Sequence, residues 1–301
     1  MKGIEIPAYI KNINELTVNS NLPIPDKLGE GEVLVKVKAC GVGFPDYLQA
    51  QGKYQIKPAA PFILGLEFSG TVAKTYSNSN FKVNDKVFGI SQGSLAEYVK
   101  VKESSLMRVP EGLSFEEASS ILVNYPTNYI GLVNRINLEK DQTILIHGST
   151  GGVGLGAVQL SKMLGAKVIA TGSSSEKLKF AKEVGADHII NLSEDKKWWE
   201  TVKEITDGEG VDAVYDPVGL VDISMKCIKF KGKILIVGFA GGKWEDVAMN
   251  RVLLKNVSLV GLHINLYTKL DPETYKNCWN HLKSISKLVV TIDDDNGKAK
   301  L

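Results

Sequence analysis

Short runs of alternating polar and apolar residues characterise the first third of the chain. Residues 32–38 (EVLVKVK) alternate in the manner of a strand with one buried face. Similar short runs follow at residues 70–73, 85–88 and 95–99, separated by glycine, proline, asparagine and aspartate. Closely spaced strands of this kind predict a small barrel or a partly rolled, mostly-β domain.

A different pattern begins near Ser114, which can cap a helix that carries Glu116 and Glu117 in its first turn. From there, apolar runs alternate with amphipathic stretches of helical period. The apolar runs predict six strands, at residues 143–147, 167–171, 188–191, 211–215, 233–237 and 257–262. Strands joined by helical crossovers indicate a parallel, doubly wound α/β sheet.

The composition adds limits to this picture. A chain of 301 residues suggests about two domains of roughly 150 residues each. The 36 Lys and Arg against 34 Asp and Glu leave a net charge of +2, which disfavours a nucleic-acid or acidic-membrane partner. The N-terminus lacks the layout of a signal peptide, and no apolar run reaches the roughly 18 residues of a membrane span. With only three cysteines as well, the sequence predicts a cytoplasmic protein, although an organelle stays open.

The most informative motif is a glycine-rich turn. The chain has 29 glycines, above the usual share of about 7%, and the segment 148–154 (GSTGGVG) follows a predicted strand and opens a helix that ends near Gly165. Glycine lets the chain turn sharply and lets a pyrophosphate approach the backbone, while the helix N-terminus attracts phosphate. The alternative is a tight turn without a ligand. The motif predicts dinucleotide contacts at Ser149, Thr150, Gly151, Gly152, Val153 and Gly154.

The identity of the nucleotide depends on the end of the second strand in this unit. An NAD site usually carries an acidic residue there, but the segment 171–175 (TGSSS) has none. Hydroxyl and ammonium groups can instead donate to a 2′-phosphate, so the sequence favours NADPH over NADH. The same serines can also cap the next helix. The predicted 2′-phosphate contacts are Ser173, Ser174, Ser175 and Lys177.

Two further loops follow the fourth and fifth predicted strands, at residues 216–219 and 238–242. Ligands of open α/β sheets bind at the carboxyl ends of the strands, so both loops are expected to contact the cofactor. Phe239 can pack against a nicotinamide, or it is an ordinary apolar loop residue. The predicted contacts in these loops are Asp216, Val218, Gly238, Phe239, Ala240 and Gly241.

Several segments occur together in the order typical of one family, at residues 41–46 (GVGFPD), 51–54 (QGKY), 64–70 (LGLEFSG), 81–89, 149–154, 211–219 and 237–241. Over residues 25–280 the chain resembles the zinc-independent medium-chain dehydrogenase/reductases, in particular the NADPH:quinone oxidoreductase group that includes zeta-crystallin. The resemblance implies a GroES-like catalytic domain (residues 1–120 and 264–301) that is split by a Rossmann NADPH-binding domain (residues 121–263). It also implies an active site in the cleft between the two domains.

The resemblance implies roles for individual residues as well. Phe44 and Thr127 are expected near the nicotinamide, although a helix-interior threonine bonded to its own backbone explains Thr127 equally well. Tyr54 is the candidate catalytic residue, because a tyrosine hydroxyl can polarise a carbonyl or donate a proton. The alternative is a tyrosine that lines the cleft without chemistry. A cofactor-contact segment of the family matches His263, Ile264 and Asn265, where a lone histidine is otherwise an ordinary half-buried residue.

The resemblance speaks against zinc. Gly43 and Leu66 occupy the positions of two zinc ligands in related alcohol dehydrogenases, and no cysteine cluster is present for a structural zinc. Without Lewis-acid polarisation, hydride transfer suits an acceptor that is already electrophilic. The family therefore implies NADPH-dependent reduction of a quinone or an α,β-unsaturated carbonyl, by a homodimer joined near residues 257–262.

Some positions depart from the family pattern. Relatives usually carry Asn at the position of Gly43 and often Tyr at that of Leu192, and they continue beyond a Gly-Lys that resembles Gly297-Lys298. An internal deletion, a truncated isoform and an altered reading frame stay open for the C-terminus. A second function is therefore kept, a catalytically weak NADPH-binding protein with a structural, regulatory or RNA-binding role. A third, a zinc alcohol dehydrogenase, predicts bound metal.

Overall fold

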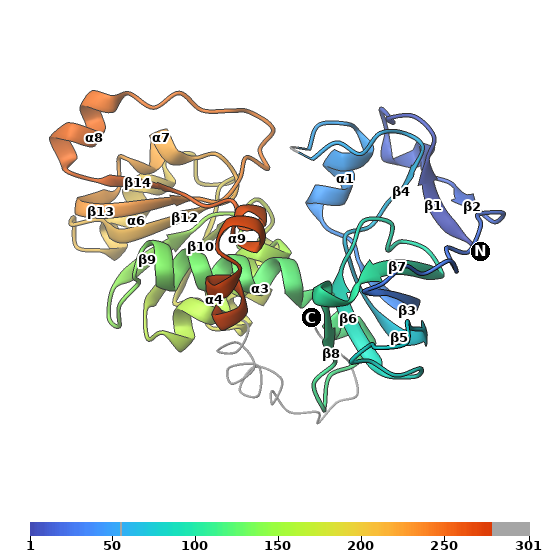
Figure 1. Ribbon diagram of the computed structural model, residues 1–301. Helices are drawn as coiled ribbons and strands as arrows, with labels where there is room; N and C mark the ends of the chain where they lie inside the picture. Colours follow the sequence, from blue (N-terminus) through green and yellow to red (C-terminus); the bar gives the residue numbers. More distant parts are fainter. Residues whose placement is uncertain (55, 279–301) are drawn as a thin grey trace. The chain divides into compact units, whose positions relative to one another are not determined.

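The computed structural model describes residues 1–54 and 56–278 of the 301-residue chain (Figure 1). The chain divides into two compact units. The first begins at Met1 and ends at Val123, and the second begins at Asn124 and holds the remaining described residues. The second unit runs past residue 263, the end of the predicted Rossmann domain, and Cys278 is buried in it. The expectations for residues 279–301 lie outside the described residues.

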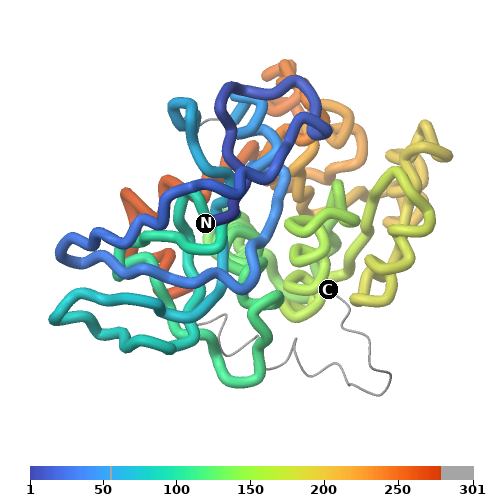
Figure 2. The backbone as a smooth tube through the Cα atoms, turned by 90° about the vertical axis from the view of Figure 1, so that its right-hand side faces the viewer, coloured from blue at the N-terminus to red at the C-terminus, as the bar shows by residue number. Residues whose placement is uncertain are grey.

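The first unit is mostly β, as predicted. Its main sheet is antiparallel, in the order β7-β3-β5-β6-β8, with β3 (Glu32–Gly41), β5 (Glu67–Lys74), β6 (Lys86–Ile90), β7 (Tyr98–Lys102) and β8 (Leu106–Arg108). A smaller sheet has the order β2-β1-β4, with β1 (Gly3–Ile6), β2 (Val18–Asn19) and β4 (Phe62–Ile63). These strands follow one another from blue to green in Figure 2. The alternation of β3 buries Val33 and Val35 against Phe68, whereas Lys36 is exposed.

Short helices complete the first unit, namely η1 (Ile13–Glu15), α1 (Phe44–Ala50), η2 (Glu103–Ser105) and α2 (Phe115–Ala118). The predicted cap at Ser114 is confirmed as a capping box. The Ser114 hydroxyl accepts a hydrogen bond from the Glu117 N–H at 3.2 Å, and the Glu117 carboxylate accepts one from the Ser114 N–H at 2.8 Å.

A pair of buried carboxyl groups lies inside the first unit, on α1 and β5. Asp46 is 3% exposed and Glu67 is 7% exposed. Burial, with the charge of Asp46 as a further cause, raises the pKa of Glu67 from 4.5 to about 8, although the Val123 N–H donates to its carboxylate at 3.1 Å. Glu67 is therefore protonated at neutral pH in the folded chain.

Glu67→Gln tests this assignment through the pH dependence of stability. A raised pKa means that the folded state holds the proton more tightly than the unfolded state, so the contribution of Glu67 is complete below about pH 4.5 and is lost as the pH rises through about 8. We expect the variant to match the wild type in free energy of unfolding near pH 5 and to exceed it at pH 9. Urea unfolding at both pH values measures the difference; equal stability at pH 9 would contradict the assignment.

The second unit is built on a six-stranded sheet whose neighbouring strands are all parallel, in the order β11-β10-β9-β12-β13-β14. The strands are β9 (Thr143–Ile146), β10 (Lys167–Gly172), β11 (His188–Asn191), β12 (Val211–Asp216), β13 (Ile228–Ile236) and β14 (Ser258–Gly261). In chain order this arrangement is 3-2-1-4-5-6, the order of the classical dinucleotide-binding sheet. The predicted doubly wound parallel sheet is confirmed.

One strand begins earlier than predicted. β13 starts at Ile228, because it pairs with β12 first at Ile228 and again from Lys233 onward, with a register shift between the two points. Lys231, at φ +61°, lies in this shift. The irregularity interrupts the apolar run, so the sequence pattern shows only the second half of the strand.

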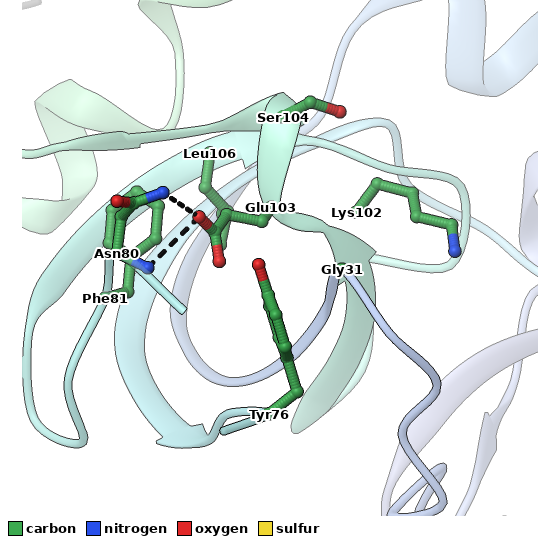
Figure 3. Close-up of a pocket in the computed structure, with 8 residues that line it drawn as sticks. All are labelled: Gly31, Tyr76, Asn80, Phe81, Lys102, Glu103, Ser104 and Leu106. Carbon is green, nitrogen blue, oxygen red and sulfur yellow. Dashed lines mark hydrogen bonds between the residues drawn. The ribbon is translucent and has the colours of Figure 1, made fainter. Parts of the chain in front are cut away.

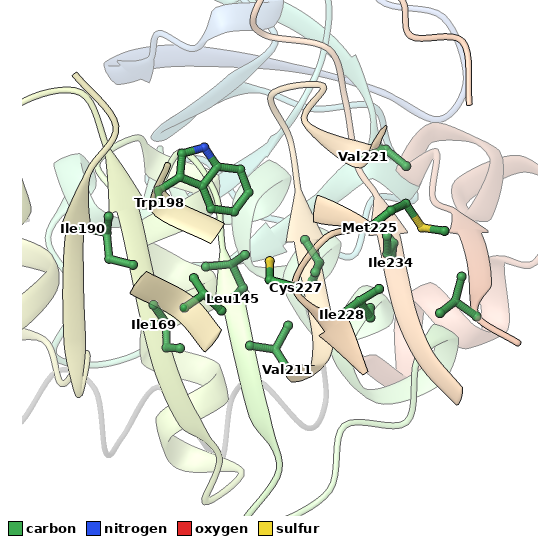
Figure 4. Close-up of a cluster of buried hydrophobic side chains, with 13 residues drawn as sticks. Leu145, Ile169, Ile190, Trp198, Val211, Val221, Met225, Cys227, Ile228 and Ile234 are labelled. Carbon is green, nitrogen blue, oxygen red and sulfur yellow. The ribbon is translucent and has the colours of Figure 1, made fainter. Parts of the chain in front are cut away.

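Helices connect the strands of the second unit, namely α3 (Ile121–Tyr129), which begins in the first unit, the π-helix η3 (Ile130–Arg135), α4 (Gly152–Met163), α5 (Ser175–Glu183), α6 (Trp198–Ile205), α7 (Val221–Ser224), α8 (Met249–Lys255) and α9 (Ile264–Leu270). A core cluster packs β-strand residues such as Leu145, Val211 and Ile234 with Trp198 of α6 (Figure 4). Within the described chain, no helix has the length and apolarity needed to cross a membrane.

Candidate cofactor-binding site

Three loops of the second unit meet at one edge of its sheet. They follow β9, β12 and β13, which are adjacent parallel strands, so their carboxyl ends lie together. The first loop is the glycine-rich turn, residues 147–151, and the others begin at residues 217 and 237. Eight of the predicted cofactor contacts fall on these loops, namely Ser149, Thr150, Gly151, Val218, Gly238, Phe239, Ala240 and Gly241.

The glycine-rich turn has the tight geometry that the sequence predicts. Gly148 has φ +58° and lies against Val218, 3.1 Å from where a Cβ would be. A Cβ on Gly154 would lie 2.2 Å from the Gly148 carbonyl oxygen, so only glycine fits there. The Gly151 N–H closes the turn by donating to the Gly148 carbonyl at 3.0 Å. The turn therefore brings the start of α4 directly onto the end of β9.

The start of α4 fits a phosphate group. Gly151 is its N-cap, and no side chain of the described residues caps it, which leaves N–H groups of the first turn available. A Cβ on Gly151 would meet only the Gly148 carbonyl, at 3.6 Å, so the backbone here faces open space. Twelve residues of helix place a positive dipole end at this point. The residues present thus suit the pyrophosphate of a dinucleotide.

Asn124 of α3 is a neighbour that the sequence did not indicate. A Cβ on Gly152 would lie 3.0 Å from the Asn124 side-chain nitrogen, which places this amide beside the start of α4. Asn128, one turn later, is fully buried. Its amide donates to the Val153 carbonyl at 3.0 Å and accepts from the Tyr215 hydroxyl at 2.5 Å. These bonds fix α3, which also carries Thr127, against the phosphate turn.

The end of β10 carries the predicted 2′-phosphate segment. The alternative reading of Ser174 is confirmed, because its hydroxyl accepts from the Lys177 N–H at 3.4 Å as the cap of α5. Ser175 is bound to Glu194, an acid that the sequence did not indicate, with its hydroxyl donating at 2.9 Å. Ser173 and the Lys177 side chain are exposed. Ser149 is tied to β10, since its hydroxyl donates to the Thr171 carbonyl at 2.9 Å.

Asp216 organises the other two loops. Its fully buried carboxylate accepts hydrogen bonds from the N–H groups of Val218 at 2.8 Å, Gly219 at 2.9 Å and Leu220 at 2.5 Å. Its carbonyl accepts from the Val237 N–H at 2.8 Å. The two loops also bond directly, from the N–H groups of Ala240 and Gly241 to the carbonyls of Pro217 and Val218. The Asp216 carboxylate is thus engaged within the loop that follows β12.

His147, at the start of the phosphate turn, connects this turn to β10 on one side and to α7 on the other. Its fully buried ring lies 2.8 Å from the Thr171 hydroxyl at Nδ1 and 2.9 Å from the Ser224 hydroxyl at Nε2. Because Ser224 donates its own proton to the Leu220 carbonyl at 2.6 Å, Nε2 carries the ring hydrogen. Burial lowers the pKa of His147 despite the charge of Asp216, so the ring is neutral. No motif in the sequence predicts this role for His147.

The remaining predicted site residues are divided between the second unit and the first unit. Phe239 is 38% exposed in the loop after β13, and Thr127 is buried in α3. Residues 263–265 follow β14 at the same edge of the sheet, with His263 exposed. Phe44, the exposed first residue of α1, and the half-buried Tyr54 belong to the first unit. All of the predicted cofactor contacts except Phe44 therefore lie in the second unit.

Two other features carry no comparable chemistry. Among residues 1–54 and 56–278, no three His, Cys, Asp or Glu side chains are grouped so that they could hold a metal ion. A surface hollow of about 550 Å³ in the first unit contains Glu103 (Figure 3). The Glu103 carboxylate is engaged there, by the Ser79 hydroxyl at 2.6 Å and the Asn80 amide at 2.6 Å. No predicted site residue lines this hollow.

Comparisons with known proteins agree with this geometry. The alcohol dehydrogenase GroES-like domain matches residues 29–111, and the zinc-binding dehydrogenase domain matches residues 152–284. The quinone oxidoreductase-like protein 2 homolog of Nematostella vectensis is 37% identical over 82% of this chain and 69% of its own length. Quinone oxidoreductase-like protein 2 of Mus musculus is 36% identical over 85% of this chain and 74% of its own.

Solved structures extend the similarity. The quinone oxidoreductase of Escherichia coli complexed with NADPH superposes with a TM-score of 0.86 at 27% identity, covering 98% of this chain and 90% of its own. A mycobacterial protein complexed with NADPH gives a TM-score of 0.86 at 30% identity, over 98% of this chain and 91% of its own.

Proposed function

Since the chain belongs to the zinc-independent medium-chain dehydrogenase/reductases of the quinone oxidoreductase group, we propose that it reduces quinones or α,β-unsaturated carbonyl compounds with NADPH. Two similar proteins were solved in complex with NADPH, which supports an NADPH-dependent oxidoreductase. The class of acceptor goes beyond these comparisons and is the new part of the proposal. The observation that carries cofactor binding is the phosphate turn, where Gly151 faces open space at the uncapped start of α4.

The residues of the second unit divide the binding of NADPH between them. The N–H groups at the start of α4 bind the pyrophosphate, and Ser173 and Lys177 are available to the 2′-phosphate. Thr127 and Phe239 orient the nicotinamide. NADPH, when bound, supplies a hydride for the acceptor. Ser175 contributes less than predicted, because Glu194 occupies its hydroxyl.

The proposed acceptor class rests on the residues at two positions of the first unit where related alcohol dehydrogenases have zinc ligands. Gly43 and Leu66 offer no metal ligand at the positions where related alcohol dehydrogenases bind zinc. A ketone or alcohol needs polarisation before hydride transfer, whereas a quinone or an enone is already electrophilic. Acceptors of that kind need only orientation beside the nicotinamide and exclusion of competing reactions.

The direct test is the oxidation of NADPH and NADH by a panel of quinones and enones, followed by the loss of absorbance of the reduced cofactor. We expect turnover with NADPH that exceeds turnover with NADH, and activity with 9,10-phenanthrenequinone or 1,2-naphthoquinone. NADPH binding without turnover on any acceptor would favour the second function, a catalytically weak binding protein. Glycine at position 43, where relatives carry Asn, is the observation that keeps this candidate.

Tyr54→Phe separates the catalytic reading of Tyr54 from a lining role. Reduction of an enone requires a proton at the substrate, while solvent can protonate a reduced quinone. We expect the variant to lose about 10- to 100-fold in kcat on an enone and to stay near the wild-type rate on an ortho-quinone. Parallel steady-state assays measure both. An equal, small effect on the two acceptors would leave Tyr54 as a lining residue.

We also propose a homodimer, as the family resemblance implies. β14 is the last strand in the order of the sheet, so its outer edge has no neighbouring strand among the described residues. Pairing of two such edges would extend the sheet across the dimer. Analytical ultracentrifugation tests this, and a monomer at micromolar concentration would overturn it.

A further inference from the structure

The loop after β13 presents a tryptophan to solvent. Trp244 is 89% exposed, the most exposed of the large hydrophobic side chains among the described residues. Its ring lies parallel to that of Phe239, with the centroids 6.1 Å apart and an interplanar angle of 10°. One face of the indole is directed at Phe239, and most of the remaining ring surface is open to a ligand. We refer to these two residues as the aromatic pair.

The aromatic pair is held in place by the residues around it. Glu245, next to Trp244, accepts a hydrogen bond from the Val221 N–H at the start of α7, at 2.7 Å. On the other side, the Lys243 carbonyl packs against Gly219, 3.3 Å from where a Cβ would be, and Phe239 packs at the same point at 3.2 Å. These contacts hold the chain on both sides of Trp244, and the stack on Phe239 positions its ring. A side chain that is positioned before binding loses less conformational freedom when a ligand binds to it.

The position of the pair connects it to the cofactor site. Phe239 lies in the loop that Asp216 organises, at the carboxyl ends of β12 and β13, where ligands of such sheets bind. If Phe239 orients the nicotinamide, as proposed above, a planar acceptor bound beside that ring comes close to the aromatic pair. Stacking on an aromatic face depends on shared ring area, so fused rings gain more from it than a single small ring.

We propose that Trp244 is a specificity-determining residue, whose indole face binds planar acceptors with fused aromatic rings, such as polycyclic ortho-quinones. This inference rests on the proposed reductase function, and it narrows the acceptor class within it. Lys243, Glu245 and Asp246 flank Trp244 and leave a formal charge of −1 beside it, which disfavours an anionic ligand and is compatible with a neutral one.

The test compares two quinones that differ in ring number, 9,10-phenanthrenequinone and 1,4-benzoquinone, on Trp244→Ala. We expect kcat/KM for phenanthrenequinone to fall at least about tenfold, mainly through KM, and kcat/KM for benzoquinone to change by less than about twofold. Trp244→Phe, which keeps an aromatic face, should recover most of the loss. Leu253→Ala, a truncation of another exposed apolar residue on α8, serves as the control and should behave as wild type.

An equal loss on both quinones, or no loss on either, would overturn the inference while leaving the reductase function intact. A binding measurement separates the two hypotheses further. Equilibrium dialysis of phenanthrenequinone against the NADP⁺-loaded protein should give a Kd that rises at least about tenfold in Trp244→Ala. If the wild type oxidises NADPH with quinones but its affinity for phenanthrenequinone is unchanged by the substitution, Trp244 is not the binding surface. If the wild type neither binds nor reduces quinones, both hypotheses fail.

Discussion

Gly151→Asp is expected to abolish NADPH binding while preserving the fold. Gly151 has φ −95° and ψ 165°, an extended conformation that any residue adopts, and a Cβ there meets no atom closer than 3.6 Å. Aspartate is also a good N-cap, so its carboxylate would accept the N–H groups of α4 that the pyrophosphate needs. At a separation of about 5 Å and an effective dielectric constant of about 20, repulsion of a phosphate charge amounts to about 3 kcal/mol. The affinity for NADPH should therefore fall by more than about 100-fold.

The distinguishing result is opposite changes in affinity and stability. The melting temperature of Gly151→Asp should equal or slightly exceed that of the wild type, because a negative cap complements the helix dipole. Gly151→Ser supplies a matched cap without charge, and its affinity for NADPH should fall much less. Calorimetric titration and thermal unfolding measure the two quantities. If Gly151→Asp bound NADPH with the affinity of the wild type, the pyrophosphate would not bind at the start of α4.

The phosphate turn is predictable because its requirements are local in sequence. A buried strand, a tight turn and a helix start follow one another within a few residues, and the positions of Gly148 and Gly154 follow from backbone contacts inside that segment. The parallel sheet is predictable for a similar reason, since its strands are apolar runs separated by helical stretches. Only β13 departs, where the irregularity at Lys231 interrupts the pattern.

The support around the turn is not predictable in this way. His147 bonds to Ser224, 77 residues later, and Asn128 bonds to Tyr215, 87 residues later. Each of these residues is chemically ordinary, and only the fold brings the partners together. Glu194 illustrates the opposite case, because it accepts a hydrogen bond from Ser175, a residue that the sequence predicts to contact the 2′-phosphate. Sequence thus indicates where a ligand binds, while the fold decides which side chains are available to it.

The same distinction makes Asp216→Ala the substitution with the largest expected effect on stability. The sequence predicts a cofactor contact at Asp216, and the structure adds that its fully buried carboxylate holds three consecutive N–H groups. Hydrogen bonds to a charged group contribute about 1.5–3 kcal/mol each, and their loss leaves partly buried donors without an acceptor. We expect a loss of at least about 3 kcal/mol in the free energy of unfolding. For a chain of this size, that lowers the melting temperature by about 5 °C.

Cofactor affinity should fall with the stability, because the loops after β12 and β13 depend on the same residue. Asp216→Asn is the matched control. Its amide oxygen can still accept from Val218 and Gly219, at the positions that now lie 2.8 and 2.9 Å from the carboxylate, while its NH₂ group faces the Leu220 N–H. The asparagine variant should therefore unfold between the wild type and the alanine variant, and should bind NADPH more weakly than the wild type. A melting temperature for Asp216→Asn equal to that of the wild type would show that the bond to Leu220 and the negative charge do not stabilise the loop, and the role assigned to Asp216 would be wrong.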